Sequence, residues 1–321
     1  MSPEPGPGPA VLVIGAGSIG TRHAANLAAL GAHVTCTDPD TARARAAAEP
    51  LGAATVELDL GALDGYDGIV VASPTRFHLD QARAALATGA AVLVEKPLAE
   101  RADQVDELVG AGDRLMVGYN LRLHEPVARL VGWVHEGRIG TVVGARLWFG
   151  SWLPDWRPQV DYRTTYSARS DLGGGVLNDA IHELDLAIWL GGPDLAVQGA
   201  TVARLGPLDI DVEDTVRALL VTPAGTPLTV ELDYLSRRYR RGIEVIGTEA
   251  TVRLDWARAV VELETADDVE TTRADIPVDV SYQREAEAFL ALVAGTGTAP
   301  VDGPTGAASL RLADAIRAAA R

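Results

Sequence analysis

The sequence lacks the features that would tie it to a membrane, to the cell exterior or to a disulfide-bonded scaffold. Its only cysteine is Cys36, so no internal disulfide can form and a reducing compartment is expected. No apolar run approaches the roughly 18 residues of a membrane span. The first ten residues, MSPEPGPGPA, contain neither the basic nor the apolar segment of a signal peptide. We therefore expect a cytoplasmic protein whose residues 1–9 are disordered.

Basic charge is also scarce. The 321 residues include 28 Lys and Arg against 44 Asp and Glu, which gives a formal net charge of −16. Nucleic acids and anionic membranes select basic surfaces, so neither is an expected partner, whereas a neutral or cationic small molecule is compatible with this balance. The hydrophobic content of 47% and the charged content of 22% are typical of a globular chain. The length favours two domains.

Lysine is nearly absent, and its position is informative. Lys96 is the only lysine among the 28 basic residues, so the other 27 are arginines. Codon bias in a chain rich in Ala, Gly, Arg and Pro accounts for most of this preference, and one surviving lysine is compatible with chance. Arginine, however, is permanently charged and presents a forked set of donors, whereas lysine is a compact ammonium that can exchange its proton. Lys96 therefore marks a candidate site where Arg does not serve.

A glycine motif follows the first apolar run of the chain. Residues 10–14 have the composition of a buried parallel strand, and glycines follow with G-x-G-x-x-G spacing at Gly15, Gly17 and Gly20. A helical pattern and a second strand come next, and that strand ends at Asp38. Such glycines allow a tight turn and a close approach of a pyrophosphate to a helix N-terminus, and an acid at this distance bonds the adenosine ribose. The stretch predicts dinucleotide binding, with NAD preferred over NADP.

Strands and helices then alternate up to residue 119. We predict strands at 55–58, 68–73, 91–95 and 114–119, with helices at about 76–87 and 102–110 between them. Six strands with helical crossovers make a doubly wound parallel sheet, a Rossmann domain at residues 1–119. Ligands bind beyond the carboxyl ends of such strands. Two segments lie at those ends: SPTRFH, residues 73–78, and EKP, residues 95–97. Pro97 keeps Lys96 out of the helical region, so its side chain can project toward the crevice.

The second half of the chain, residues 120–321, has a different pattern. After a helical stretch at 127–140, alternating segments occur at about 141–150, 196–203, 215–222, 227–236, 242–247, 250–255 and 259–264. They predict an α+β domain with a large, open and mostly antiparallel sheet. Two helices, at about 283–294 and 307–320, close the chain.

One predicted helix in this half carries polar side chains. GGGVLNDAIHELDLAIWLGG starts with three glycines and continues as an apolar helix interrupted by Asn178, Asp179, His182 and Asp185. Their spacings of three or four residues place them on neighbouring helical positions. They are explained either by a His–Asp pair with an acid near the helix N-terminus or by a catalytic site. We expect no metal, because no second cluster with ligand spacing is visible.

Taken in order, these motifs resemble the glucose–fructose oxidoreductase / inositol dehydrogenase / MocA family over essentially the whole chain. The resemblance rests on GAGSIG, the acid after the second strand, EKP, GYN and the GGG-to-WL helix. It implies NAD(P)-dependent oxidation or reduction of a sugar, an aminosugar or a cyclitol by a homodimer or homotetramer. The commoner family pattern has Asp four residues before the histidine. This sequence has Asn178 there and Asp179 one residue later, so either residue remains a candidate for substrate contact.

The resemblance also implies roles for particular residues. Lys96 would stabilise the reacting oxygen, His182 would accept its proton, and Asp179 or Asn178 would orient the substrate. The cofactor-binding candidates are Gly15, Gly17, Ser18, Ile19, Gly20, Asp38, Ser73, Pro74, Thr75, His78, Glu95 and Lys96. The substrate-binding candidates are Tyr119, Asn120, Arg122, Tyr162, Arg163, Tyr166 and Asn178.

Two other functions fit the same pattern. A related enzyme can oxidise and re-reduce a sugar in order to epimerise or cleave it, without releasing NADH. A non-catalytic sugar sensor can use the same scaffold, although it would not need both Lys96 and His182.

Overall fold

A computed structural model describes residues 8–110 and 112–320, and the chain divides into two compact units. Unit 1 comprises residues up to Leu123 together with Val278–Ala307, and unit 2 comprises His124–Pro277 and the remaining C-terminal residues. The predicted disorder at 1–9 falls almost wholly outside the described residues. Pro9 is described, and its carbonyl oxygen accepts a hydrogen bond of 2.9 Å from the His33 amide.

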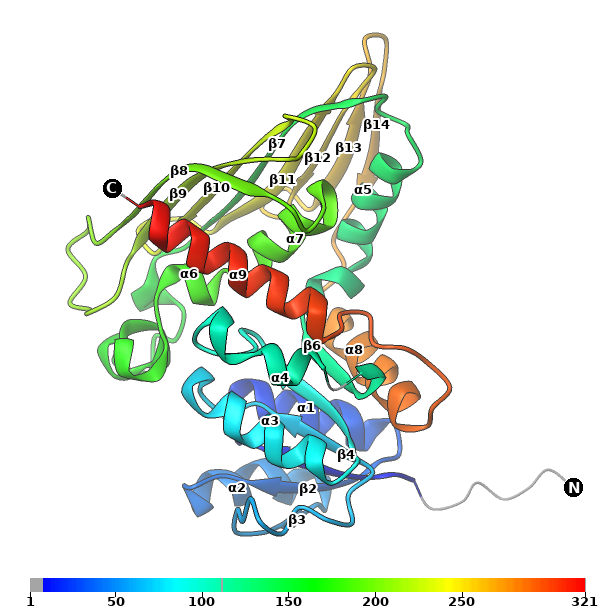
Figure 1. Cartoon of the computed structure of the whole chain (residues 1–321), viewed down its shortest axis with the longest axis vertical. Helices are drawn as coiled ribbons and strands as arrows, with labels where there is room; N and C mark the ends of the chain where they lie inside the picture. Colours follow the sequence, from blue (N-terminus) through cyan, green and yellow to red (C-terminus); the bar gives the residue numbers. More distant parts are fainter. Residues whose placement is uncertain (1–7, 111, 321) are drawn as a thin grey trace, which may run out of the picture. The chain divides into compact units, whose positions relative to one another are not determined.

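Unit 1 contains the predicted parallel sheet (Figure 1). Its six strands lie in the order β3-β2-β1-β4-β5-β6, and every neighbouring pair is parallel. The strands are β1 (Ala10–Ile14), β2 (His33–Thr37), β3 (Ala54–Thr55), β4 (Gly68–Val71), β5 (Ala91–Glu95) and β6 (Leu115–Gly118). Every residue of β4, β5 and β6 is buried, as expected for parallel strands covered on both faces.

The helices of unit 1 follow the predicted alternation. They are α1 (Ser18–Ala29), α2 (Thr41–Ala48), α3 (His78–Ala87), α4 (Asp106–Val109), α8 (Asp279–Val293) and the first residues of α9 (Gly303–Ala319). Short 3-10 turns include η2 (Thr75–Phe77), η3 (Ala102–Gln104) and η5 (Asn120–Leu123). The start of α2 shows why a helix begins where it does, because the Asp40 side chain accepts hydrogen bonds from the amides of Ala42 and Arg43.

Unit 1 is not a single continuous segment ending at the predicted boundary, residue 119. We expected a second domain running without interruption from 120 to 321, but residues 278–307 belong to unit 1. The physical reason is the core under α8. Ala286, Phe289 and Leu292 of this helix pack in one cluster with Leu27 of α1 and Val70 of β4. A helix that covers one face of the first sheet is therefore supplied by the end of the chain.

Unit 2 is built on the predicted open sheet (Figure 1). Its eight strands lie in the order β14-β13-β12-β11-β7-β10-β9-β8, and all pairs are antiparallel except β7 with β10. The strands are β7 (Val142–Gly150), β8 (Ala196–Ala203), β9 (Thr215–Val221), β10 (Pro227–Asp233), β11 (Arg240–Gly247), β12 (Thr251–Asp255), β13 (Val260–Glu264) and β14 (Val269–Arg273).

Helices cover one face of this sheet and leave the other open. The covering helices are α5 (Glu125–His135), α6 (Val176–Asp179), α7 (His182–Gly191) and the later part of α9, as Figure 1 shows. Along β9, Val216, Ala218 and Leu220 are buried, whereas Leu219 between them is 42% exposed. This alternation places Leu219 on the open face, which also carries the ion pair between Arg146 and Glu231 (2.8 Å).

Three details of the predicted elements were wrong. The third strand is only two residues long and starts at Ala54, and strand β14 was not predicted because its exposed sequence VETTR has no buried face. The predicted continuous helix after the three glycines is interrupted. It ends as α6 at Asp179 and resumes as α7 at His182, with Ala180 at φ −98° and ψ 29° between them.

Within the described residues, none of the helices combines the length and the apolar character that crossing a membrane requires.

Candidate active site

The glycine loop of unit 1 has the geometry that its spacing predicted. Gly15 adopts a φ of +96°, and a Cβ there would lie 2.7 Å from the carbonyl carbon of Ala72. A Cβ on Gly20 would lie 1.8 Å from the Gly15 oxygen, so this glycine allows α1 to pack against the turn. No described atom lies within 4 Å of a Cβ built on Gly17. Gly17 therefore leaves room beside the loop, and the candidates Ser18 and Ile19 open helix α1.

Asp38 lies at the same loop, at the end of the second strand. Its Oδ2 accepts a hydrogen bond of 2.8 Å from the Ala16 amide, and its Oδ1 accepts one of 2.9 Å from the Asp40 amide. These bonds hold the carboxylate beside the glycine turn. The nearest cationic partner is Arg43, whose Nη1 lies 4.0 Å from Oδ2.

His78 connects the two segments that follow β4 and β5. Its Nε2 lies 2.8 Å from the Ser73 carbonyl oxygen, and its Nδ1 lies 2.8 Å from the Pro97 carbonyl oxygen. Burial lowers the pKa of His78, although both carbonyl groups favour the protonated form. A ring nitrogen that carries a proton donates to the carbonyl oxygen that it faces. Pro74 and Thr75 lie on the bridged segment, at the start of η2.

The lone lysine follows the last residue of β5. The side chain of Glu95 is buried, and its Oε2 accepts a hydrogen bond of 3.2 Å from the Lys96 amide. Its Oε1 lies 2.7 Å from His23 Nε2 on α1. The backbone at Lys96 is therefore tied to a buried polar pair.

In unit 2, the three glycines form the turn that begins α6. Gly173 and Gly175 have φ of +82° and +106°, and a Cβ on Gly174 would lie 2.2 Å from the Tyr166 carbonyl oxygen. The turn is closed by Asn178. Its Nδ2 donates to the carbonyls of Gly173 (2.8 Å) and Gly174 (3.3 Å), and its Oδ1 accepts from Arg317 (2.5 Å). Asn178 is thus buried and committed to structural bonds.

Asp179 and His182 lie on either side of the helix break. The Oδ2 of Asp179 accepts a hydrogen bond of 2.6 Å from the Tyr234 hydroxyl, and Asp179 is partly exposed. Burial, together with the charge of Asp179, raises the pKa of Tyr234 well above its ordinary value, so this hydroxyl remains a donor. His182 is the first residue of α7, with a side chain that is mostly buried. Asp185, one turn later, accepts a bond of 3.5 Å from Ser309.

The remaining predicted lining residues differ in their burial and in their structural partners. Asn120 is buried and donates to the Ser281 hydroxyl (2.7 Å), and exposed Arg163 is paired with Asp161 (2.7 Å). Tyr162 accepts a hydrogen bond of 3.1 Å from the Asp209 amide. Those three side chains therefore have structural partners. Tyr119 is buried, and Arg122 and Tyr166 are half-buried, as is Tyr162.

Sequence reasoning missed several polar side chains around these positions. The missed residues are Tyr234, the buried ion pair of Glu183 with Arg241 (2.6 Å), and His23 and Glu285, which cluster with the predicted residue Glu95. Of these, only Glu183 lay within a quoted motif, the helix that follows the three glycines. Charged residues inside otherwise apolar helical patterns were the available signal, as at Glu183 and Glu285.

Comparisons with known proteins match both units of the fold. Residues 10–119 match the profile described as oxidoreductase family, NAD-binding Rossmann fold, and residues 127–253 match that of the GFO/IDH/MocA C-terminal domain. A dTDP-3,4-didehydro-2,6-dideoxy-alpha-D-glucose 3-reductase of Streptomyces antibioticus is 30% identical over 327 residues, covering 96% of this chain and 93% of the relative.

Two further proteins are similar to this chain. Myo-inositol dehydrogenase Hyg17 of Streptomyces leeuwenhoekii is 32% identical over 221 residues, covering 65% of each protein. The crystal structure of GenD2 from gentamicin A biosynthesis, in complex with NAD, is 25% identical, with a TM-score of 0.83 and coverage of 98% of this chain and 94% of that chain.

Proposed function

Because the chain belongs to the GFO/IDH/MocA oxidoreductase family, we propose that it transfers hydride between NAD and a secondary alcohol or ketone carbon of a sugar, an aminosugar or a cyclitol. The observation that carries this proposal is a combination within unit 1. An open glycine loop and an anchored acid, Asp38, occur in the same unit as the only lysine, which follows β5.

The residues of unit 1 fit a dinucleotide. The glycine loop and the N-terminus of α1 hold the pyrophosphate, and the fixed carboxylate of Asp38 accepts hydrogen bonds from the adenosine ribose. His78 holds the segments after β4 and β5 together, which supports the nicotinamide half of the site. When bound, NAD supplies the group that accepts or returns hydride.

Lys96, His182 and Asp179 carry the chemistry. Lys96 donates a hydrogen bond to the reacting oxygen and stabilises the negative charge that grows on it. His182 takes the hydroxyl proton as general base and returns it in the reverse direction. Asp179 holds a neighbouring substrate hydroxyl, because its carboxylate is partly exposed and oriented by Tyr234, whereas the polar atoms of Asn178 are all engaged.

The substrate is a polyhydroxylated ring, free or carried on a larger scaffold. The relatives act on a deoxy sugar nucleotide and on myo-inositol according to their names, and GenD2 belongs to gentamicin biosynthesis. A single cysteine is compatible with the reducing cytoplasm.

The experiment that tests this function is NADH absorbance across a panel of sugars, aminosugars and cyclitols. We expect net NAD reduction with at least one ring substrate. Conversion of a sugar without net NADH would favour an epimerase or glycosidase that recycles NAD, and sugar binding without conversion would favour a sensor. Equal turnover of simple aliphatic alcohols would contradict a ring-specific site.

We further propose that the protein is a homodimer or homotetramer assembled through the open face of the unit 2 sheet. That face combines exposed apolar groups such as Leu219 with ordered ion pairs such as Arg146–Glu231. Surfaces of this mixed kind are typical of subunit interfaces.

A further inference from the structure

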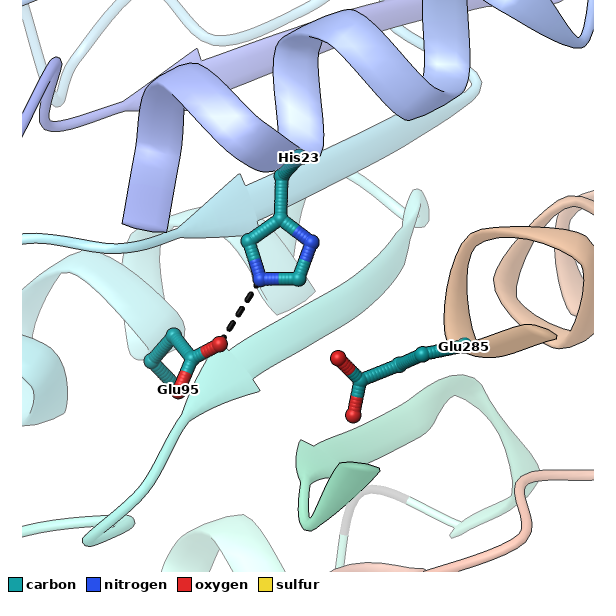
Figure 2. Close-up of side chains that lie close together, drawn as sticks. All are labelled: His23, Glu95 and Glu285. Carbon is teal, nitrogen blue, oxygen red and sulfur yellow. Dashed lines mark hydrogen bonds and ion pairs between the residues drawn. The ribbon is translucent and has the colours of Figure 1, made fainter. Parts of the chain in front are cut away.

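Three buried ionisable side chains meet inside unit 1 (Figure 2), and one of them, Glu95, directly precedes the lone lysine. His23 of α1, Glu95 at the end of β5 and Glu285 of α8 point toward one another, and their nearest ligand-type atoms all lie within 4.8 Å. His23 and Glu285 are fully buried, and Glu95 is 8% exposed. Three separate elements therefore bring their ionisable groups to one water-poor point.

The spacing within this cluster fits shared protons better than a metal ion. His23 Nε2 and Glu95 Oε1 are 2.7 Å apart, the length of a strong hydrogen bond. Two ligands on one tetrahedral metal, each at about 2.1 Å from it, are separated by about 3.4 Å. The pair is thus already joined by a proton.

Glu285 is the member whose presence is hardest to explain by packing. Both of its carboxyl oxygens are buried and have no hydrogen-bond partner among the described residues, and the carboxyl group faces the His23–Glu95 pair in Figure 2. Burial and the negative charge of Glu95 raise the pKa of Glu285 well above its ordinary value. Both effects favour the neutral, protonated form of Glu285 beside the His23–Glu95 pair.

Glu95 is held in the opposite state. Burial alone would raise its pKa, but the hydrogen bond and charge of His23, together with Lys96, hold the pKa below its ordinary value. Its carboxylate is also confined sterically. A Cβ on Gly118, its partner on β6, would lie 3.0 Å from the Glu95 Cδ. Oε2 accepts a hydrogen bond from the Lys96 amide. Any displacement of this carboxylate therefore also moves the backbone that carries the lysine side chain.

We propose that His23 and Glu285 are positioning residues for hydride transfer: they enclose the Glu95 carboxylate, His23 by a hydrogen bond and Glu285 by close approach, and through the bond of Glu95 to the Lys96 amide they fix the catalytic lysine. The proposal rests on the role of Lys96 given above. Loss of the Glu285 proton at alkaline pH places a second negative charge against Glu95, displaces its carboxylate and releases Lys96.

Other charged groups lie around the cluster, and their effect on the pKa of Glu285 must be separated from that of Glu95. Arg22 of α1 lies over the Tyr282 ring and near Asp279, and Arg284 of α8 donates to the Leu123 carbonyl. The elements packed against α8 are α1, β5 and η5, of which η5 adds Arg122, and Lys96 follows the end of β5. The raised pKa of Glu285 is explained by burial and by Glu95, not by these cations.

The first test compares kcat across about pH 6 to pH 10 for the wild type and four variants. Glu285→Gln imitates the neutral acid, so we expect kcat within about twofold of wild type at neutral pH and a smaller alkaline loss. Glu285→Leu and Gly118→Ala should lower kcat about tenfold at every pH with unchanged NAD affinity. Phe289→Leu, one turn along α8 and equally buried, is the packing control, with an unchanged pH profile. Identical pH profiles for wild type and Glu285→Gln overturn the proposal.

The second test needs no activity. A carboxyl group whose pKa is raised by folding costs stability above its unfolded value, about 4.3 for Glu, and costs nothing below it. The melting temperature of Glu285→Gln should therefore exceed that of wild type by an amount that grows as pH rises above this value. The difference between Phe289→Leu and wild type should not depend on pH. A Glu285→Gln difference that is equally constant means that Glu285 only fills space.

The two tests separate this inference from the proposed function. If Lys96→Arg retains wild-type kcat, the catalytic role of Lys96 fails, whatever Glu285 does. If Lys96→Arg is inactive while Glu285→Leu, Gly118→Ala and wild type share one kcat, the positioning network alone fails.

Discussion

At Asp38, we expect one carboxylate to set the preference for NAD over NADP. Both of its oxygens accept backbone amides, so it cannot turn away from a ribose bound at the loop. A 2′-phosphate would meet this fixed charge, although Arg43 lies 4.0 Å away and offers partial compensation. We expect a higher kcat/KM with NAD than with NADP, and at least about a tenfold narrowing of the ratio in Asp38→Ala. Steady-state kinetics with both cofactors provide the measurement. Equal values in the wild type would contradict it.

Lys96 is the single lysine of an arginine-rich chain, and its proposed catalytic role can be tested directly. Lys96→Arg retains the charge but changes the size and the direction of the donors. Removing one preorganised donor from a developing oxyanion costs on the order of 10²–10³ in kcat, and we expect a loss of that size. The dissociation constant of NAD, measured by fluorescence, should change little. Arg83→Lys on α3, where the partly exposed arginine pairs with Glu107 at 2.9 Å, is the matched reverse exchange and should be silent. A Lys96→Arg enzyme with near wild-type kcat would show that the single lysine has no catalytic role.

At the scale of elements, the turn before α6 combines backbone strain with close packing. Gly175 has a φ of +106°, and a Cβ there would lie 2.4 Å from the Glu213 carboxylate, whose Oε1 accepts the Leu177 amide. Gly192, after α7, has a φ of +88° but no described atom within 4 Å of its Cβ position. We expect Gly192→Ala to cost about 1 kcal/mol and Gly175→Ala at least about 2 kcal/mol more. Chemical denaturation of both variants measures the difference, and equal costs would mean that Glu213 moves aside freely.

Most of the element order could be predicted from the sequence, because periodicity reports burial. The parallel strands, the glycine loop and the alternating strands of unit 2 all carry such a signal. Strand β14 does not, since it is exposed along its length. The break at Ala180 and the assignment of α8 to unit 1 depend on tertiary partners, which an amphipathic pattern does not name. For the same reason, isolated residues such as His23 could not be connected to Glu95.

The candidate site also combines features that the local sequence predicts with features that depend on tertiary partners. Motif spacing located the glycine loop, Asp38 and the segments that His78 bridges, because each depends on local backbone geometry. It did not distinguish Asn178 from Asp179. The two residues differ in their partners, because Arg317 donates to Asn178 and Tyr234 donates to Asp179. Both partners are far along the chain, so spacing does not reveal them.

For the whole molecule, the open sheet face predicts the oligomeric state. Leu219 lies on that face, whereas Leu205, which is 68% exposed, lies in a loop after β8. Placing a charge in an apolar interface costs enough to dissociate it. We expect Leu219→Asp to reduce the molar mass in light scattering toward that of one chain, and Leu205→Asp to leave it unchanged. An oligomer that survives Leu219→Asp would indicate another interface.

During protein synthesis, unit 1 cannot finish folding until residues 278–307 have been made. The first 123 residues leave the ribosome before α8 exists, and Val278 follows 155 positions after Leu123. At about 5–20 residues per second, the face that Phe289 covers stays bare for roughly 8–30 s. During that interval, the uncovered apolar face of the nascent chain is a site for chaperone binding or aggregation. A fragment ending at residue 119 should therefore bind hydrophobic dyes and unfold without cooperativity, and appending residues 278–307 through a flexible linker should restore a cooperative transition.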